Sequence, residues 1–179
     1  MPNWDEFVAA FKADERHSSI PTANDIYANF IGEWDFEWIS NAGTSEEFRV
    51  KGEWLFVRAL NGRAIADLFI CPSREERKQA GMPEGEYGLS VRTYSPETRT
   101  WHVCYSCGGK PDVLESIPAR NGDIVHHLVN KEYKSIWAFT EITDTSFHWS
   151  NRTSQDNGQS WITVGDVYAT RRHCDMNNV

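Results

Sequence analysis

Hydrophobic and polar residues alternate along most of this chain, which is the pattern of half-buried β-strands. The clearest case is residues 30–38, in which Trp34, Phe36 and Trp38 occupy every second position and acidic residues occupy the positions between them. One face of this strand is therefore aromatic, and the opposite face is suited to solvent. So large an aromatic face needs a core or a cavity to cover it.

The same alternation, broken by turn residues such as Asn61-Gly62 and Asn157-Gly158, continues to the end of the chain. Further strands are predicted over 46–59, 63–71, 86–94, 99–107, 112–119, 123–130, 134–142, 146–153 and 159–172. The connections are too short to hold crossover helices, so neighbouring strands should be antiparallel. Such a meander exposes its edges unless it closes. We therefore predict an all-β fold, an up-and-down antiparallel barrel of about ten strands.

Helical patterns are confined to the connections and the N-terminus. Trp4, Phe7 and Phe11 recur at helical spacing within residues 3–14, which predicts a short amphipathic helix. A helical turn is expected over 25–30, and Ser73 is a suitable N-cap for a charged helical insertion over 73–85. We divide the chain into a helix and lead-in at 1–29, a single barrel domain at 30–172 and a flexible tail at 173–179.

A short helical turn running into Gly32-x-Trp34, with Arg171 or Arg172 at the end of the last strand, resembles the lipocalin and calycin signature. Residues 62–67, 87–96 and 147–161 are similar to bacterial calycin-like proteins. The resemblance implies a β-barrel in which the basic residue packs over Trp34 in a cation–π contact. It implies the fold and no particular reaction. Lipocalins are usually secreted and disulfide-bonded, whereas for this chain we expect neither secretion nor disulfides.

Composition and charge restrict the partners. The chain of 179 residues has 8 Trp and 13% aromatic residues, and its formal net charge is −8. This charge argues against a duplex nucleic acid or an anionic membrane as the partner. No apolar run has the length of a membrane span, and the first residues lack a secretory signal. We therefore expect a cytoplasmic protein with reduced cysteines at Cys71, Cys104, Cys107 and Cys174.

Metal and cofactor patterns are weak. Cys104 and Cys107 form a Cys-x-x-Cys sequence, but residues three apart on a strand face opposite sides, and a second ligand pair is missing from the sequence. His126 and His127 are adjacent, so only one of them can point inward. A metal site would need several inward histidines. We predict no metal and no cofactor.

Three charged residues, Arg58, Asp67 and Arg92, share strand faces with apolar or aromatic neighbours. A buried carboxylate is costly without a partner, so Asp67 should meet an arginine or a tyrosine hydroxyl. Two interpretations remain open. The three residues could anchor a ligand's carboxylate, phenol or carbonyl, or Asp67 and Arg92 could form a buried salt bridge that fixes barrel closure.

Inward aromatic residues either fill a barrel of this size or leave room for one small ligand. We favour a ligand cavity. The candidate ligand-binding residues share inward-facing strand positions: Trp38, Phe56, Arg58, Asp67, Phe69, Arg92, Tyr94, Tyr105, Trp137, Trp149 and Asn151.

The function we expect is binding of a small, mostly apolar or aromatic molecule inside the barrel. The alternative is a cofactor-free enzyme of the isomerase, cyclase or lyase type, in which Asp67 and His126 would be the catalytic acid–base residues. A third interpretation is a structural protein whose barrel is packed shut. A small-molecule ligand is the expected partner, and a homodimer is compatible with the sequence.

Overall fold

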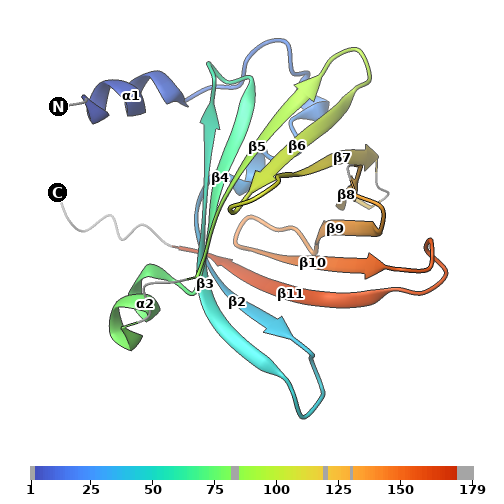
Figure 1. The fold of residues 1–179 in the computed structure, drawn as a ribbon. Helices are drawn as coiled ribbons and strands as arrows, with labels where there is room; N and C mark the ends of the chain where they lie inside the picture. The colour runs from blue at the N-terminus through green and yellow to red at the C-terminus, as the bar shows by residue number, and fades with distance from the viewer. Residues whose placement is uncertain (1–2, 82–84, 119–120, 130, 173–179) are drawn as a thin grey trace.

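The computed structural model describes residues 3–81, 85–118, 121–129 and 131–172. Within these residues, ten antiparallel strands form a closed barrel (Figure 1). Each strand pairs with the next in sequence, and β11 pairs with β2 to close it. The strands are β2 (Gly32–Ser40), β3 (Phe48–Ala59), β4 (Ala64–Cys71), β5 (Glu86–Ser95), β6 (Thr100–Ser106), β7 (Asp112–Pro118), β8 (Ile124–Leu128), β9 (Lys134–Thr140), β10 (Ser146–Ser154) and β11 (Ile162–Arg171). The predicted fold class is confirmed, and the tail predicted at 173–179 lies outside the described residues.

The strand boundaries depart most from the prediction at β11, which begins at Ile162 rather than at residue 159. The carboxylate of Asp156 accepts hydrogen bonds from the Ser160 backbone nitrogen at 2.8 Å and from the Ser160 hydroxyl at 2.6 Å. It also accepts one from the Ser154 hydroxyl at 2.8 Å. These bonds hold residues 154–160 in a turn, so the strand starts later than its polar–apolar alternation suggests.

The N-terminal helix α1 (Trp4–Phe11) is shorter than predicted, because Lys12–Ala13 forms a two-residue strand, β1, that pairs with the end of β3. The Asn3 side chain caps α1 by accepting from the Glu6 backbone nitrogen at 3.2 Å. None of the described residues of α1 is buried, and Trp4 is 70% exposed. In Figure 1, α1 accordingly stands away from the barrel wall.

The charged insertion contains a second helix, α2 (Arg74–Ala80), which Ser73 caps by accepting from the Glu76 backbone nitrogen at 3.1 Å. Arg74 pairs with Glu53 on the outward face of β3 at 2.7 Å. Figure 1 shows α2 outside the barrel, beside β3. Neither described helix has the length and apolarity needed to cross a membrane.

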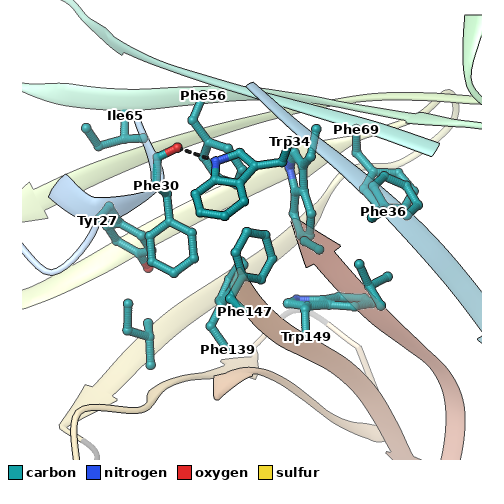
Figure 2. Packing of buried hydrophobic residues seen from close by; sticks show 14 of the residues in the cluster. Tyr27, Phe30, Trp34, Phe36, Phe56, Ile65, Phe69, Phe139, Phe147 and Trp149 are labelled. Atoms are coloured by element: carbon teal, nitrogen blue, oxygen red, sulfur yellow. Dashed lines mark hydrogen bonds between the residues drawn. The ribbon is translucent and has the colours of Figure 1, made fainter. Parts of the chain in front are cut away.

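One end of the barrel is filled by the lead-in, which contains two short 3-10 helices, η1 (Thr22–Asn24) and η2 (Ala28–Phe30). The Phe30 ring packs against Phe139 and Phe147, with ring centres 4.8 and 5.0 Å apart (Figure 2). The indole nitrogen of Trp34 donates to the Phe30 carbonyl at 2.8 Å, drawn as the dashed line in Figure 2. Tyr27 is also fully buried here. Aromatic rings therefore fill this half of the barrel, which we call the closed end.

The basic residue expected over Trp34 is Arg171, whose Cζ lies 4.2 Å from the centre of the Trp34 ring. Arg171 also donates to the Ile31 carbonyl at 2.8 Å. Arg172 points to the other side of the strand and pairs with Glu33 on the outer surface at 2.9 Å. The cation–π contact implied by the resemblance is confirmed, and the structure assigns it to Arg171.

Candidate ligand-binding cavity

The half of the barrel opposite the lead-in contains a cavity of about 360 Å³. Its position follows from strand direction: β2 starts at the closed end, so Trp38, near the far end of β2, lies toward the open end, as do Glu86 and Asp112, the first residues of β5 and β7. The volume is in the range of small-molecule sites. The lining residues are Trp38, Trp54, Phe69, Glu86, Ser90, Arg92, Tyr105, Asp112, Trp137, Trp149, Asn151 and Val164.

The cavity has a continuous aromatic wall that crosses several strands. The ring centres of Trp38 and Trp149 are 6.0 Å apart, and those of Trp137 and Trp149 are 5.6 Å apart. Tyr105 meets Trp137 edge to face at 5.4 Å. Such tilted and edge-to-face contacts are the favourable geometries for aromatic pairs. They hold the rings as rigid, flat surfaces around the open space.

Two glycines make room for these rings. A Cβ atom at Gly88 would overlap the Tyr105 ring and hydroxyl, and one at Gly165 would overlap the Trp38 ring. Only glycine lets the inward rings lie this close to the neighbouring backbone. Gly88 and Gly165 thus help to set the shape of the cavity, a role that strand parity alone does not reveal.

The polar groups at the mouth are carboxylates and their partners. The Tyr105 hydroxyl donates to the Glu86 carboxylate. Burial first, and then the negative charge of Glu86, raise the pKa of Tyr105 above its usual range, so this phenol remains a neutral donor. Asp112 pairs with Lys131 at 2.9 Å. The Asn151 side-chain oxygen accepts from the Ser135 hydroxyl at 3.0 Å.

The floor of the cavity is formed by Arg92, which is only 3% exposed and pairs with Asp67. The indole nitrogen of Trp54 donates to the other Asp67 oxygen at 2.6 Å. The partner expected for a buried Asp67 is therefore present. Burial lowers the pKa of Arg92 to about 10, which leaves it charged at neutral pH. Among the described residues, the Nε atom of Arg92 has no hydrogen-bond partner.

His126 is 2% exposed and lies behind this floor, toward the closed end. The Tyr27 hydroxyl and His126 Nε2 form a hydrogen bond, and His126 Nδ1 lies 3.3 Å from the Trp137 carbonyl. Burial, followed by the nearby charge of Arg92, lowers the pKa of His126 to about 3. The imidazole is therefore neutral, with one nitrogen accepting and the other donating.

The structure brings seven of the candidate ligand-binding residues together around the cavity: Trp38, Phe69, Arg92, Tyr105, Trp137, Trp149 and Asn151. The other four lie elsewhere. Asp67 is held by Arg92 and Trp54 and is not among the lining residues, and Phe56 is in the filled core. Tyr94 packs on Trp101, 5.6 Å between ring centres. Arg58 is at the closed end, where it binds Asp25 through two hydrogen bonds of 2.6 and 3.2 Å.

Five lining residues were not among the candidates: Trp54, Glu86, Ser90, Asp112 and Val164. Trp54 and Ser90 could have been found, because they share strand parity with Phe56 and Arg92. Glu86 and Asp112 begin their strands next to turns, where an acidic residue is normally read as facing solvent. Strand parity with Ser90 and Leu114 nevertheless directs both side chains inward.

No protein-family model matches the sequence, and no curated protein matches it. Solved structures share the architecture, including the following two. The S-type phycobiliprotein lyase CPES from Guillardia theta is 12% identical, with a TM-score of 0.59 over 97% of this chain and 99% of that one. Rv2717c from M. tuberculosis is 10% identical, with a TM-score of 0.57 over 89% of this chain and 100% of that one. The fold is a calycin-like β-barrel. At these identities the likeness concerns the fold alone.

Proposed function

We propose that the protein binds a small, mostly apolar or aromatic molecule in the open half of the barrel. The observation that supports this most strongly is the cavity of about 360 Å³, bounded by rings of Trp38, Trp137 and Trp149, beside a closed end that is filled. Ligand sites are typically such concave, aromatic-lined spaces with a few polar groups to fix orientation.

The contrast between the two halves strengthens the proposal. Protein interiors are normally packed as densely as organic crystals, and the Phe30, Phe139 and Phe147 rings at the closed end follow this rule. The same kinds of side chain at the open end leave a space instead. The Tyr105 and Trp38 rings lie close against the backbone at Gly88 and Gly165, away from this space. An aromatic guest would restore the missing dispersion contacts on the open side of these rings.

The alternative, an enzyme that uses Asp67 and His126 as an acid–base pair, has less support. Neither side chain is among those that line the cavity. Asp67 is held by Arg92 and Trp54, and the low pKa of His126, about 3, makes it a poor base at neutral pH. We infer a structural role for both residues, in which they fix the floor of a binding cavity.

Calorimetric titration with 2-(1-naphthyl)ethanol, an uncharged two-ring aromatic, tests the proposal. Val164 lines the mouth, whereas Thr163 is the exposed neighbour on the same strand. Val164→Trp should weaken binding at least tenfold by filling the mouth, and Thr163→Trp should leave it unchanged. Equal effects of the two substitutions, or no binding by the unmodified protein, would contradict the proposal.

A further inference from the structure

Glu86, at the mouth of the cavity, has a carboxylate that forms no ion pair with any residue that the structure describes. It lines the cavity, and its carboxylate accepts a hydrogen bond from Tyr105, a neutral donor. Within the described part of the chain, Glu86 forms no ion pair; the nearby Arg77 donates to the backbone carbonyls of Pro72 and Glu86 instead. A half-buried carboxylate of this kind favours a positively charged partner.

The other charges leave the mouth negative. Asp112 is a second carboxylate in the wall and is paired with Lys131. Among the described lining residues, the positive one is Arg92, which is deep in the barrel and already paired with Asp67. Its charge is thus balanced before any ligand binds, and an anionic ligand would have to compete with Asp67 for it.

The aromatic wall favours the same kind of ligand. An aromatic ring stabilises a nearby cation through its quadrupole, and Tyr105 is the ring beside Glu86. The chain of ring contacts runs from Trp149 through Trp137 to Tyr105, and Tyr105 itself binds Glu86. A ligand whose rings lie against the tryptophans can therefore extend a charged group to the Glu86 carboxylate.

The floor is suited to a neutral acceptor. Arg92 Nε is a buried donor without a hydrogen-bond partner among the described residues, and Ser90 beside it is 2% exposed and lines the cavity. An unsatisfied buried donor costs free energy, which an uncharged oxygen on the deep end of a ligand would recover.

From these observations we propose that the cavity selects aromatic molecules carrying a protonated amine, with the rings between Trp38, Trp137 and Trp149 and the amine at the mouth against Glu86. This inference rests on the proposed binding function and names its ligand class. It differs from an anionic anchor at Arg92, which would place the charged end of the ligand at the floor.

Three probes with the same ring system test the inference by calorimetry at pH 7 and low salt: 2-(1-naphthyl)ethylamine, 2-(1-naphthyl)ethanol and 1-naphthaleneacetate. The amine should bind at least tenfold more tightly than the alcohol, a difference of about 1.4 kcal/mol. The carboxylate should bind most weakly. Added salt should lower the affinity of the protein for the amine and leave its affinity for the alcohol unchanged.

Substitution of Glu86 locates the effect. Glu86→Gln should lower the affinity for the amine about tenfold and change the affinity for the alcohol less than twofold. Retained binding of the alcohol would also show that the variant is folded. The matched control is Glu97→Gln, because Glu97 is exposed in the turn between β5 and β6 at the closed end. This control removes the same charge and should change neither affinity.

The outcomes separate the two proposals. Equal affinities for the three probes, or loss of alcohol binding in Glu86→Gln, would overturn amine selection and leave aromatic binding intact. Tightest binding of 1-naphthaleneacetate would assign the charged contact to Arg92 and would also overturn it. If none of the probes binds, both amine selection and the proposed function fail.

Discussion

The Cζ atom of Arg171 lies 4.2 Å from the centre of the Trp34 ring, so the last strand of the barrel is tied to the first at the closed end. The same guanidinium donates to the carbonyls of Ile31 at 2.8 Å and Asp144 at 2.6 Å. These carbonyls belong to the lead-in and to a turn, where the strand ladder offers them no donor. One side chain thus fixes three separate segments of the chain.

Arg171→Ala should lower the free energy of unfolding by about 2–4 kcal/mol, because it removes a cation–π contact and leaves backbone acceptors without donors. Arg171→Lys should recover only part of this loss, since an ammonium group lacks the planar, multiple donors of a guanidinium. Urea unfolding measures both. Arg152→Ala, which removes an outer contact with Trp161 at 5.8 Å, is the control and should cost less than about 1 kcal/mol. Full stability of Arg171→Lys would contradict the multiple-donor role.

Asp67→Asn should destabilise the barrel by about 3–5 kcal/mol, because the buried guanidinium of Arg92 would lose its counter-charge. The affinity for 2-(1-naphthyl)ethanol should change less than twofold, since Asp67 does not line the cavity. Thermal unfolding and calorimetry give the two quantities. A double variant, Asp67→Asn with Arg92→Gln, should be more stable than the sum of the single losses predicts. Additive losses would show that the pair is not coupled.

The stability of the protein should fall as the pH drops below about 6.5, because of His126. Its pKa is about 3 in the folded protein and about 6.5 in the unfolded chain, so between these values only the unfolded chain binds the proton. Stability from this group is therefore complete above pH 6.5 and is lost on acidification, by roughly 1–2 kcal/mol between pH 6.5 and 5.

Denaturant unfolding at several pH values in this range measures the slope, that is, how steeply the free energy of unfolding falls as the pH is lowered. His126→Gln should flatten it, whereas His127→Gln should retain it, because His127 is the adjacent residue on β8 and faces the other side of the strand. A slope that survives in His126→Gln would assign the pH dependence to another group.

Gly165→Ala should weaken the binding of 2-(1-naphthyl)ethanol by about tenfold, because the added methyl group would push the Trp38 ring into the cavity. The free energy of unfolding should fall by about 1–3 kcal/mol for the same reason. The intrinsic fluorescence should also shift, since Trp38 would change its surroundings. Thr163→Ala, on the same strand but outside the barrel, is the matched control. Unchanged affinity in Gly165→Ala would show that Trp38 does not shape the site.

Much of the fold could be predicted from strand parity. The alternation around Trp34 and Phe36 predicts which side chains face inward, and the short turns leave an antiparallel barrel as the economical solution. The likeness to the calycin signature further placed a basic residue over Trp34. Parity also brought Asp67 and Arg92 to the same face of adjacent strands, which made their ion pair predictable.

The candidate site could be predicted only in part, because parity says which residues point inward but not how deep in the barrel they lie. Phe56 and Trp38 have the same parity, but Phe56 is packed in the filled half and Trp38 lines the cavity. Arg58 also points inward, but the lead-in supplies Asp25 as its partner. The lead-in runs directly into β2, which places it at the Trp34 end of the barrel, but no local pattern predicts how far it reaches between the other strands.

The sequence by itself determined the architecture of this protein, because a two-residue period and turn residues are local properties that survive any arrangement of the chain. The Gly32-x-Trp34 signature also indicated that the barrel is closed at the Trp34 end. Only the tertiary structure decided how much of the other half is open. That outcome depends on the lead-in filling one end, on the close packing of Tyr105 and Trp38 against Gly88 and Gly165, and on barrel closure, which brings Glu86 and Asp112 from separate strands to one mouth. Each of these is a contact between segments distant in sequence, and the space they leave exists only once the barrel has closed.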